Sequence, residues 1–135
     1  MTEANLDLAR RGYDYWSNGD IEGMLDLATP DIEFVPAIAA GVEGGSVQGP
    51  DAFRRFFADL AETWETFLIK VEEYREFGDS VMTVGRLTAK GRGSALELDQ
   101  PWYTVLTVRE GKIARMESFL DRDAAEERAR SEAGS

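Results

Sequence analysis

Residues 97–121, ELDQPWYTVLTVREGKIARMESFLD, decide the fold of this chain. Apolar and polar side chains alternate through most of this stretch, which is typical of β-strands. A Glu-Gly pair at 110–111 interrupts the alternation and predicts a tight hairpin between two strands, residues 96–108 and 112–120. Pro101 falls inside the first of these strands. Because proline cannot donate to the hydrogen-bond ladder, it predicts a bulge or an edge position there.

Two more strands precede this hairpin. Apolar side chains recur at every second position over residues 67–71, in a strand expected to run from 66 to about 77, and the alternation returns over residues 81–89. Turns are expected at 78–79 and 91–94. Four long strands joined by short turns predict an antiparallel meander, not βαβ units.

The first part of the chain has the periodicity of helices instead. Apolar side chains three and four residues apart predict an amphipathic first helix. After the Asn-Gly-Asp cap at 18–20 they predict a short second helix that ends before Pro30, with a short strand over 31–36. The apolar faces of the two helices are Leu6, Ala9, Tyr13 and Trp16, then Ile21, Met24, Leu25 and Ala28.

A glycine-rich loop and a third helix follow. The loop covers residues 37–49 and has two interpretations, the rim of a pocket or disorder. Pro50 suits the first position of the third helix. Beyond the last strand, Asp121 could cap a short C-terminal helix over about 122–135, with a frayed tail as the alternative. The aromatic face of the third helix is Phe53, Phe56, Phe57, Leu60 and Trp64.

The composition limits the chemistry. Among 135 residues there is no cysteine and no histidine, which excludes disulfides, a thiolate nucleophile and the commonest general base and metal ligand. No metal and no cofactor are therefore expected. Asp and Glu number 26 against 15 Lys and Arg, a formal charge of −11 that would repel nucleic acid and an anionic membrane. With no long apolar segment and no secretory signal, a cytoplasmic protein is expected.

These elements predict one α+β domain over residues 1–135, in which N-terminal helices pack on a strongly curved, mainly antiparallel sheet. Gly85 and Pro101 allow the long strands to bend. A bent sheet closed by helices makes a cone-shaped fold whose open end can hold a ligand. The same elements could also pack without a cavity.

Three segments carry a family resemblance: NGDIEGMLDLATPDIEFVP (18–36), GPDAFRRFFADL (49–60) and ELDQPWYTVLTVREGKIARMESFLDRDAA (97–125). Together they resemble the nuclear transport factor 2-like superfamily, and more narrowly the SnoaL-like polyketide cyclases and ketosteroid isomerase-like proteins. The resemblance implies a cone with an apolar pocket, usually in a dimer. Such proteins include isomerases, cyclases, epoxide hydrolases, dehydratases and binding modules without catalysis, so the fold does not settle the function.

The catalytic residues of the isomerases carry over only in part. The position of their aspartate base is Pro36, that of their tyrosine is near Gly12, and that of their protonated acid is near Tyr103. A phenol at Tyr103 could still donate a hydrogen bond to a carbonyl oxygen. Isomerase activity of that type is not expected.

The epoxide hydrolase-like members imply an Asp-Arg-Asp arrangement, which is also incomplete. Arg86 is close to the arginine position, but Thr88 and Ser118 replace the two aspartates. Glu117 is one residue away from Ser118, and strand alternation sends it to the opposite face unless a bulge intervenes. This activity is therefore disfavoured.

The resemblance and the pattern together nominate site residues. Should the chain be an enzyme, which stays open, Tyr103 is the oxyanion donor, Arg86 binds an anionic or carbonyl group, and Glu117 or Asp99 is the base. Trp102 and Tyr103 face opposite sides, and the hydrolase-like register places Trp102 towards the pocket. The residues expected to line the pocket are Tyr13, Trp16, Phe34, Phe57, Trp64, Thr88, Trp102, Met116, Ser118 and Leu120.

The leading hypothesis is a SnoaL-like protein that binds an apolar or aromatic small molecule, with isomerase or cyclase chemistry near a carbonyl as its catalytic version. The alternative is a non-catalytic module that dimerises or recruits a protein. A homodimer through the sheet is expected under both hypotheses. The alternative predicts a large apolar outer face on the four long strands.

Overall fold

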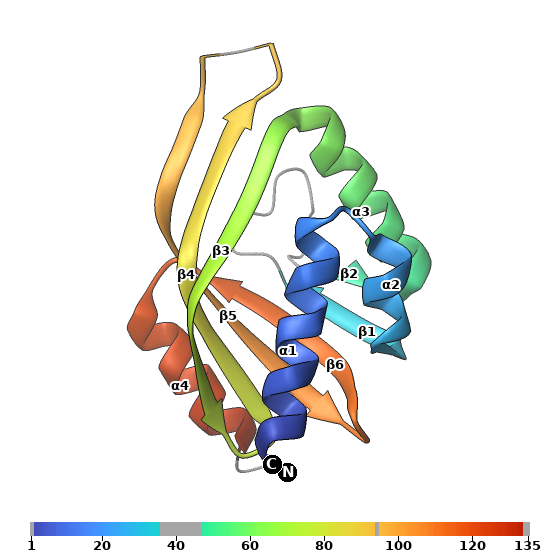
Figure 1. The fold of residues 1–135 in the computed structure, drawn as a ribbon, viewed down its shortest axis with the longest axis vertical. Helices are drawn as coiled ribbons and strands as arrows, with labels where there is room; N and C mark the ends of the chain where they lie inside the picture. Colours follow the sequence, from blue (N-terminus) through green and yellow to red (C-terminus); the bar gives the residue numbers. More distant parts are fainter. Residues whose placement is uncertain (1, 36–46, 94, 134–135) are drawn as a thin grey trace.

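The computed structural model describes residues 2–35, 47–93 and 95–133, and it confirms the expected α+β fold (Figure 1). None of the described helices is both long and apolar enough to cross a membrane. The elements in chain order are α1 (Thr2–Ser17), α2 (Ile21–Asp26), β1 (Ala28–Val35), β2 (Val47–Gln48), α3 (Pro50–Thr63), β3 (Trp64–Phe77), β4 (Ser80–Gly91), β5 (Glu97–Arg109), β6 (Lys112–Phe119) and α4 (Arg122–Ala133).

The described strands form one curved sheet in the order β2-β1-β6-β5-β4-β3. β3 to β6 make the predicted antiparallel meander, and β1 joins it in parallel beside β6. At the β5–β6 hairpin Glu110 and Gly111 have φ angles of 53° and 77°. Two successive positive φ angles are what the favoured two-residue hairpin turn requires. Most of the loop expected over 37–49 lies outside the described residues, although β2 forms at its end.

Pro101 lies where β5 has a single described neighbour. It pairs with Arg86 of β4 in a continuous register, while the pairing of β5 with β6 begins only at Tyr103. Of the two expectations, the structure therefore supports the edge position and not the bulge.

The β3–β4 pair bends at Gly85. Val71 pairs with Gly85 and Glu73 pairs with Val84, so β3 carries one extra residue at this point. A Cβ on Gly85 would lie 2.2 Å from the carbonyl oxygen of Lys70, a distance that no side chain tolerates. Glycine is thus required at Gly85 for the two backbones to approach this closely, as the sequence suggested for a bend.

α1, α2 and α3 cover the inner face of the sheet, and the main core lies between them (Figure 1). Its centre is a group of edge-to-face rings: the centroids of Trp16 and Phe57 are 4.6 Å apart, those of Phe53 and Phe57 are 4.8 Å apart, and those of Phe34 and Phe56 are 5.1 Å apart. Each such pair stabilises the fold by about 1 kcal/mol beyond its area burial. These contacts hold the helices against the inner face of the sheet.

Two residues expected on helical faces belong to strands instead. Ala28 begins β1 and pairs with Ile113, and Trp64 begins β3 and pairs with Gly91. α2 ends early because Pro30 favours an extended conformation in the residue before it. Both side chains are still buried in the main core, so the apolar pattern was right about burial and wrong about the element.

α4 covers part of the outer face. Asp121 accepts a hydrogen bond of 2.9 Å from the backbone N–H of Ala124, so the described residues 122–133 form a capped helix and not a frayed tail. Ala125 and Ala129 pack on Met82 and Val105 in a second, smaller core. Where α4 leaves the outer face open, the exposed side chains of β4 are polar or charged, whereas Leu68 of β3 is an exposed apolar side chain. α4 therefore covers part of the outer face that the interaction-module hypothesis expected to be apolar and open.

Candidate functional site

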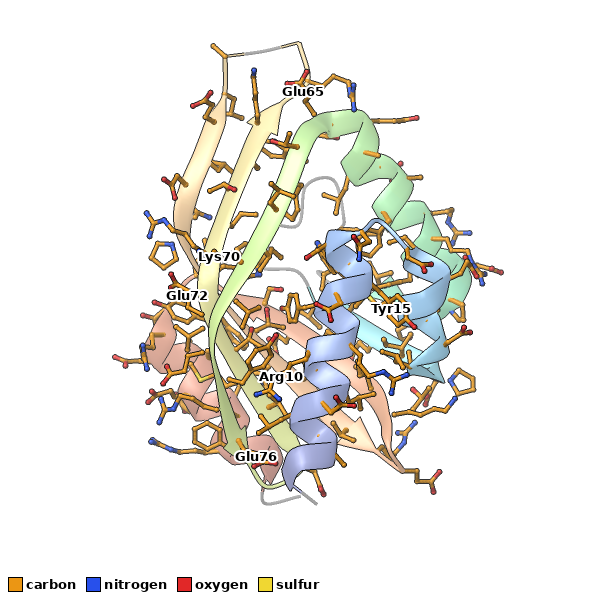
Figure 2. The ribbon with its side chains drawn as sticks, viewed as in Figure 1. Arg10, Tyr15, Glu65, Lys70, Glu72 and Glu76 are labelled. Carbon is orange, nitrogen blue, oxygen red and sulfur yellow. The ribbon has the colours of Figure 1, made fainter. Side chains whose placement is uncertain are left out.

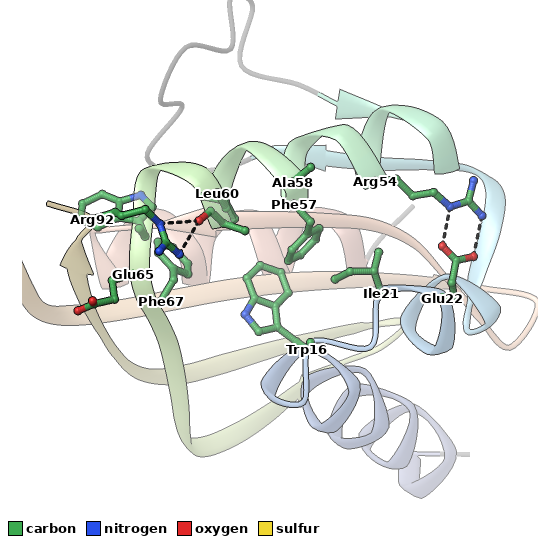
Figure 3. A pocket seen from close by; sticks show the side chains of 13 residues that line it. Trp16, Ile21, Glu22, Arg54, Phe57, Ala58, Leu60, Glu65, Phe67 and Arg92 are labelled. Atoms are coloured by element: carbon green, nitrogen blue, oxygen red, sulfur yellow. Dashed lines mark hydrogen bonds and ion pairs between the residues drawn. The ribbon is translucent and has the colours of Figure 1, made fainter.

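A pocket of about 580 Å³ opens where the end of α1, the start of α2, α3 and the neighbouring ends of β3 and β4 meet (Figure 3). We call it the mouth pocket. Its volume is within the range of small-molecule sites. Its lining includes the aromatic residues Trp16, Phe57, Trp64 and Phe67, the aliphatic residues Ile21, Ala58, Leu60 and Ala61, and the charged residues Glu22, Arg54, Glu65 and Arg92.

Aromatic rings from three elements give the mouth pocket an apolar wall. Trp16 comes from the apolar stripe of α1, Phe57 from α3, and Phe67 from the inward-facing positions of β3. The Phe67 ring lies 6.1 Å from the Trp64 ring and 6.4 Å from the Trp102 ring, centroid to centroid. The row continues the packed core outwards to the surface of the pocket, so a ligand there would cover ring surface.

Arg54 stands at the α2 end of the mouth pocket. Its Nε and Nη2 donate to the carboxylate of Glu22 at 2.6 and 2.8 Å, and its Nη1 donates to Asp51 at 2.8 Å. The hydrogen bond from Arg54 lowers the pKa of Glu22. Glu22 is therefore an ionised carboxylate already bound to a cation, which makes it a poor general base.

Arg92 stands at the opposite end. Its backbone N–H donates to the carbonyl of Thr63 at 3.1 Å, and its Nε and Nη2 both donate to the carbonyl of Ala61, at 3.2 and 3.0 Å. These bonds satisfy carbonyl groups at the C-terminus of α3, which the helix itself leaves open. Glu65 lies at the same end (Figure 3), and one of its oxygens is 3.4 Å from Nζ of Lys90, which is outside the lining.

A cluster of buried hydroxyl groups lies between α1 and the inner face of the sheet. The Tyr13 hydroxyl donates a hydrogen bond of 2.7 Å to Oγ1 of Thr104. Thr104 pairs across the sheet with Thr83 on one side and Ser118 on the other, and all three are buried. Burial raises the pKa of Tyr13, so this phenol is neutral at physiological pH and its hydroxyl is used within the fold.

One cation–π contact and one unpaired polar atom lie on the same side of the sheet. The guanidinium carbon of Arg10, which Figure 2 shows on α1, lies 5.3 Å from the centre of the Tyr74 ring on β3, a cation–π contact. The indole Nε1 of Trp102 is buried and has no hydrogen-bond partner among the described residues.

Most residues expected to line a pocket are on the inner face. Trp16, Phe57 and Trp64 line the mouth pocket. The others that share this face are buried in the core and are not in the pocket lining: Tyr13, Phe34, Trp102, Met116 and Ser118. Trp102 faces inward and Tyr103 outward, in the sense that the sequence suggested.

The three nominated catalytic residues do not reach this face. Tyr103 packs in the small core under α4, because its neighbour Trp102 occupies the inner side of β5. Arg86 is exposed and hydrogen-bonds to Asp99 across the β4–β5 pair. Glu117 is ion-paired with Arg115 at 2.9 Å and with Arg128 of α4 at 3.2 Å.

These placements correct the sequence-based site. A strand side chain one position from an inward residue points outward, and Tyr103 and Glu117 are each such a neighbour. Asp99 pairs with Arg86 on the outer face and so is no base for an inner ligand. Thr88 also alternates to the outer face, and Leu120, just past the end of β6, is 51% exposed.

Sequence reasoning missed the charged residues of the mouth pocket. Arg54 follows Asp51 by three residues on α3, a spacing that favours a helical ion pair, but its contact with Glu22 joins residues 32 apart. Arg92 lies in the glycine-rich turn 91–94, which gives no sign that it reaches α3. Phe67 alternates in step with the apolar residues Ile69 and Val71 on its strand, and this spacing could have nominated it. Among the described residues, no group of three or more acidic side chains could hold a metal ion.

Comparison with known proteins gives the family. Residues 9–116 match the SnoaL-like domain. An uncharacterised protein of Mycobacterium tuberculosis is 32% identical over 128 residues, which cover 93% of this chain and 95% of that protein. An uncharacterised protein of Mycobacterium bovis matches to the same extent. The chain belongs to the SnoaL-like domain family, as its sequence resemblance suggested.

Solved structures agree with this fold. The crystal structure of TerC co-crystallised with polyporic acid has a TM-score of 0.77 and 26% identity, covering 92% of this chain and 96% of that one. An NTF2-like protein of Burkholderia pseudomallei has a TM-score of 0.79 at 18% identity, covering 93% and 96%. A protein of Catenulispora acidiphila with a ketosteroid isomerase-like fold, in complex with trimethylamine, has a TM-score of 0.73 at 15% identity, covering 90% and 91%.

Proposed function

We propose that the chain binds an apolar or aromatic small molecule in the mouth pocket. The observation that carries this proposal is the wall formed by Trp16, Phe57 and Phe67 in a pocket of about 580 Å³. Pockets of this size with an apolar wall and a few polar groups at the ends are typical of ligand sites. TerC, whose structure is similar to this one, was co-crystallised with polyporic acid, which supports a small molecule as the ligand.

Binding is better supported than catalysis. The two described carboxylates in the lining, Glu22 and Glu65, are each paired with a cation. Tyr103 and Glu117, which an isomerase or cyclase reaction near a carbonyl would have used, lie on the outer face. A reaction of that class would need a general base beside the ligand, and neither carboxylate of the described lining is free to act as one.

The proposal is tested with a neutral aromatic probe. N-phenyl-1-naphthylamine becomes fluorescent on entering an apolar site, and we expect saturable binding with one site per chain. Ala58→Phe should abolish this binding, because Ala58 is an exposed lining residue whose enlargement fills the pocket without disturbing the core. Glu62→Phe places the same ring on the same helix, at an exposed position outside the lining, and should leave binding intact.

Two outcomes would contradict the proposal. One is the absence of saturable probe binding by the folded protein. The other is equal binding by Ala58→Phe and the unsubstituted protein, which would place the probe elsewhere. Circular dichroism of each variant confirms that the comparison is made between folded proteins.

Homodimerisation through the sheet stays a prediction. Because α4 covers part of the outer face, we expect the interface on the open part of that face, where Leu68 of β3 is 54% exposed. Light scattering coupled to size exclusion measures the mass directly. Leu68→Lys should shift a dimer towards 15.0 kDa monomers if this face is the interface.

A further inference from the structure

We propose that Arg92 is an anion-binding point of the mouth pocket, so that the preferred ligand is an aromatic acid. The ring of such a ligand would lie against Trp16, Phe57 and Phe67, and its carboxylate or other anionic oxygen would meet the guanidinium. This inference rests on the proposed function, because it names the class of ligand for the same pocket.

The guanidinium of Arg92 is held in position before any ligand binds. Nε and Nη2 share the carbonyl oxygen of Ala61 at 3.2 and 3.0 Å, and the backbone N–H of the same residue is fixed to Thr63 at 3.1 Å. Figure 3 shows this side chain reaching α3 at the Leu60 and Phe67 end of the pocket. An arginine held in this way loses less side-chain freedom when it binds an anion.

The guanidinium also has donors to spare. An arginine carries five N–H groups, and the hydrogen bonds of the Arg92 side chain within the described structure all go to the one carbonyl of Ala61. A carbonyl oxygen compensates the positive charge only in part. None of the carboxylates in the described ranges forms an ion pair with Arg92, so its charge is available to a ligand.

Arg54 shows the contrast within the same pocket. Its three nitrogens donate to Glu22 and Asp51, so two carboxylates already compensate its charge. Glu65, the carboxylate in the lining at the Arg92 end, is paired with Lys90. Of the two lining arginines, Arg92 is therefore the one placed to receive an anion beside the aromatic wall.

A charge-assisted hydrogen bond is stronger than a neutral one, and guanidinium matches the two oxygens of a carboxylate. An aromatic carboxylate should therefore bind more tightly than its neutral amide of the same shape. With Arg92 at the edge of an open pocket, where solvent weakens the attraction, we expect a preference of about tenfold.

The experiment compares 2-naphthoate with 2-naphthamide as competitors of bound N-phenyl-1-naphthylamine. The unsubstituted protein should prefer the acid by about tenfold. Arg92→Gln should lose this preference by weakening the acid, while the amide and the neutral probe bind as before. Arg55→Gln, which removes the same charge from an exposed α3 residue outside the lining, should keep the preference.

The outcomes separate the two proposals. If the neutral probe binds but acid and amide compete equally, or if neither competes, the anion-binding point is refuted and the pocket stands. If Arg92→Gln weakens both competitors equally, Arg92 only supports the end of α3, and the inference is overturned. If the probe itself does not bind, the proposed function fails and the inference fails with it.

Discussion

The hydroxyl of Tyr13 donates a hydrogen bond of 2.7 Å to Oγ1 of Thr104, and this bond ties α1 to the middle of the sheet. Both residues are almost fully buried, so neither partner has access to bulk water. The bond joins residues 91 apart in the sequence, which makes it a tertiary contact and not a local one. The first prediction follows from it.

Tyr13→Phe should lower the free energy of unfolding by about 1–2 kcal/mol, because the ring still fills its place while Thr104 keeps a buried hydroxyl with one partner fewer. Urea denaturation followed by circular dichroism measures the change. Tyr15→Phe is the control, since Tyr15 is half-buried on the same helix and no hydrogen bond of its hydroxyl is described. Equal losses in both variants would show that the Tyr13 hydroxyl has no special role.

The second prediction concerns alkaline pH. Burial raises the pKa of Tyr13 above its ordinary value of 10.0, although its hydrogen bond with Thr104 acts in the opposite direction. The folded state then holds the phenolic proton to a higher pH than the unfolded state. This contribution to stability is complete below pH 10 and is lost as the pH rises through the higher pKa of the folded state.

The measurement is denaturation of the unsubstituted protein and Tyr13→Phe between neutral pH and pH about 11. The unsubstituted protein should lose stability more steeply above pH 10. Some slope should remain in Tyr13→Phe, because burial also raises the pKa of Tyr74. Parallel curves for the two proteins would contradict the prediction.

The third prediction concerns the attachment of α4. Glu126 accepts a hydrogen bond of 2.5 Å from Arg75 of β3, and Arg122 and Arg130 lie on the same carboxylate at 3.5 and 3.8 Å. The Arg75 hydrogen bond lowers the pKa of Glu126 below its ordinary 4.5. Its contribution to stability is therefore present above pH 4.5 and is lost as the pH falls through the lower pKa of the folded state.

Glu126→Gln should lower the denaturation midpoint at pH 7, and the difference from the unsubstituted protein should shrink below pH about 4. Glu127→Gln makes the same change of charge at the next position, which is exposed and forms no ion pair with a described residue. It should leave the midpoint unchanged. A deficit of Glu126→Gln that persists undiminished in acid would rule out the ion pairs as its cause.

The sequence was informative wherever one local pattern decides the structure. The alternation in residues 97–121 gave the β5–β6 hairpin, and Glu110-Gly111 gave its turn, because two positive φ angles suit few residue pairs. Inside and outside faces could also be assigned relative to each other, as Trp102 and Tyr103 show. Alternation divides a strand into two faces, but it does not say which face the helices cover. For a nominated residue such as Arg86, only the packed structure shows that its side chain is on the outer face.

The charged ends of the mouth pocket could not be predicted for a different reason. Arg54 of α3 contacts Glu22 of α2, and Arg92, which follows β4, contacts Ala61 of α3. Each contact joins residues about 30 apart in the sequence. Such contacts exist only once α2, α3 and β4 are packed. The family resemblance did not help, because it directed attention to catalytic positions that this chain has changed.

The last prediction concerns the bend in the sheet. Gly85→Ala should destabilise the protein by about 3 kcal/mol or more, because the added Cβ would lie 2.2 Å from the backbone oxygen of Lys70 and 3.1 Å from Cα of Val71. Neither atom belongs to a flexible side chain that could move aside.

Gly12→Ala is the matched control: its added Cβ meets Cδ1 of Ile113 at 3.4 Å, an ordinary contact, and alanine favours a helix over glycine by up to about 1 kcal/mol. Gly12→Ala should therefore be neutral or stabilising in the same urea denaturation experiment. Similar stabilities for the two alanine variants would mean that β3 can move away from Gly85, and that the close approach of the two strands is not required for the curve that shapes the cone.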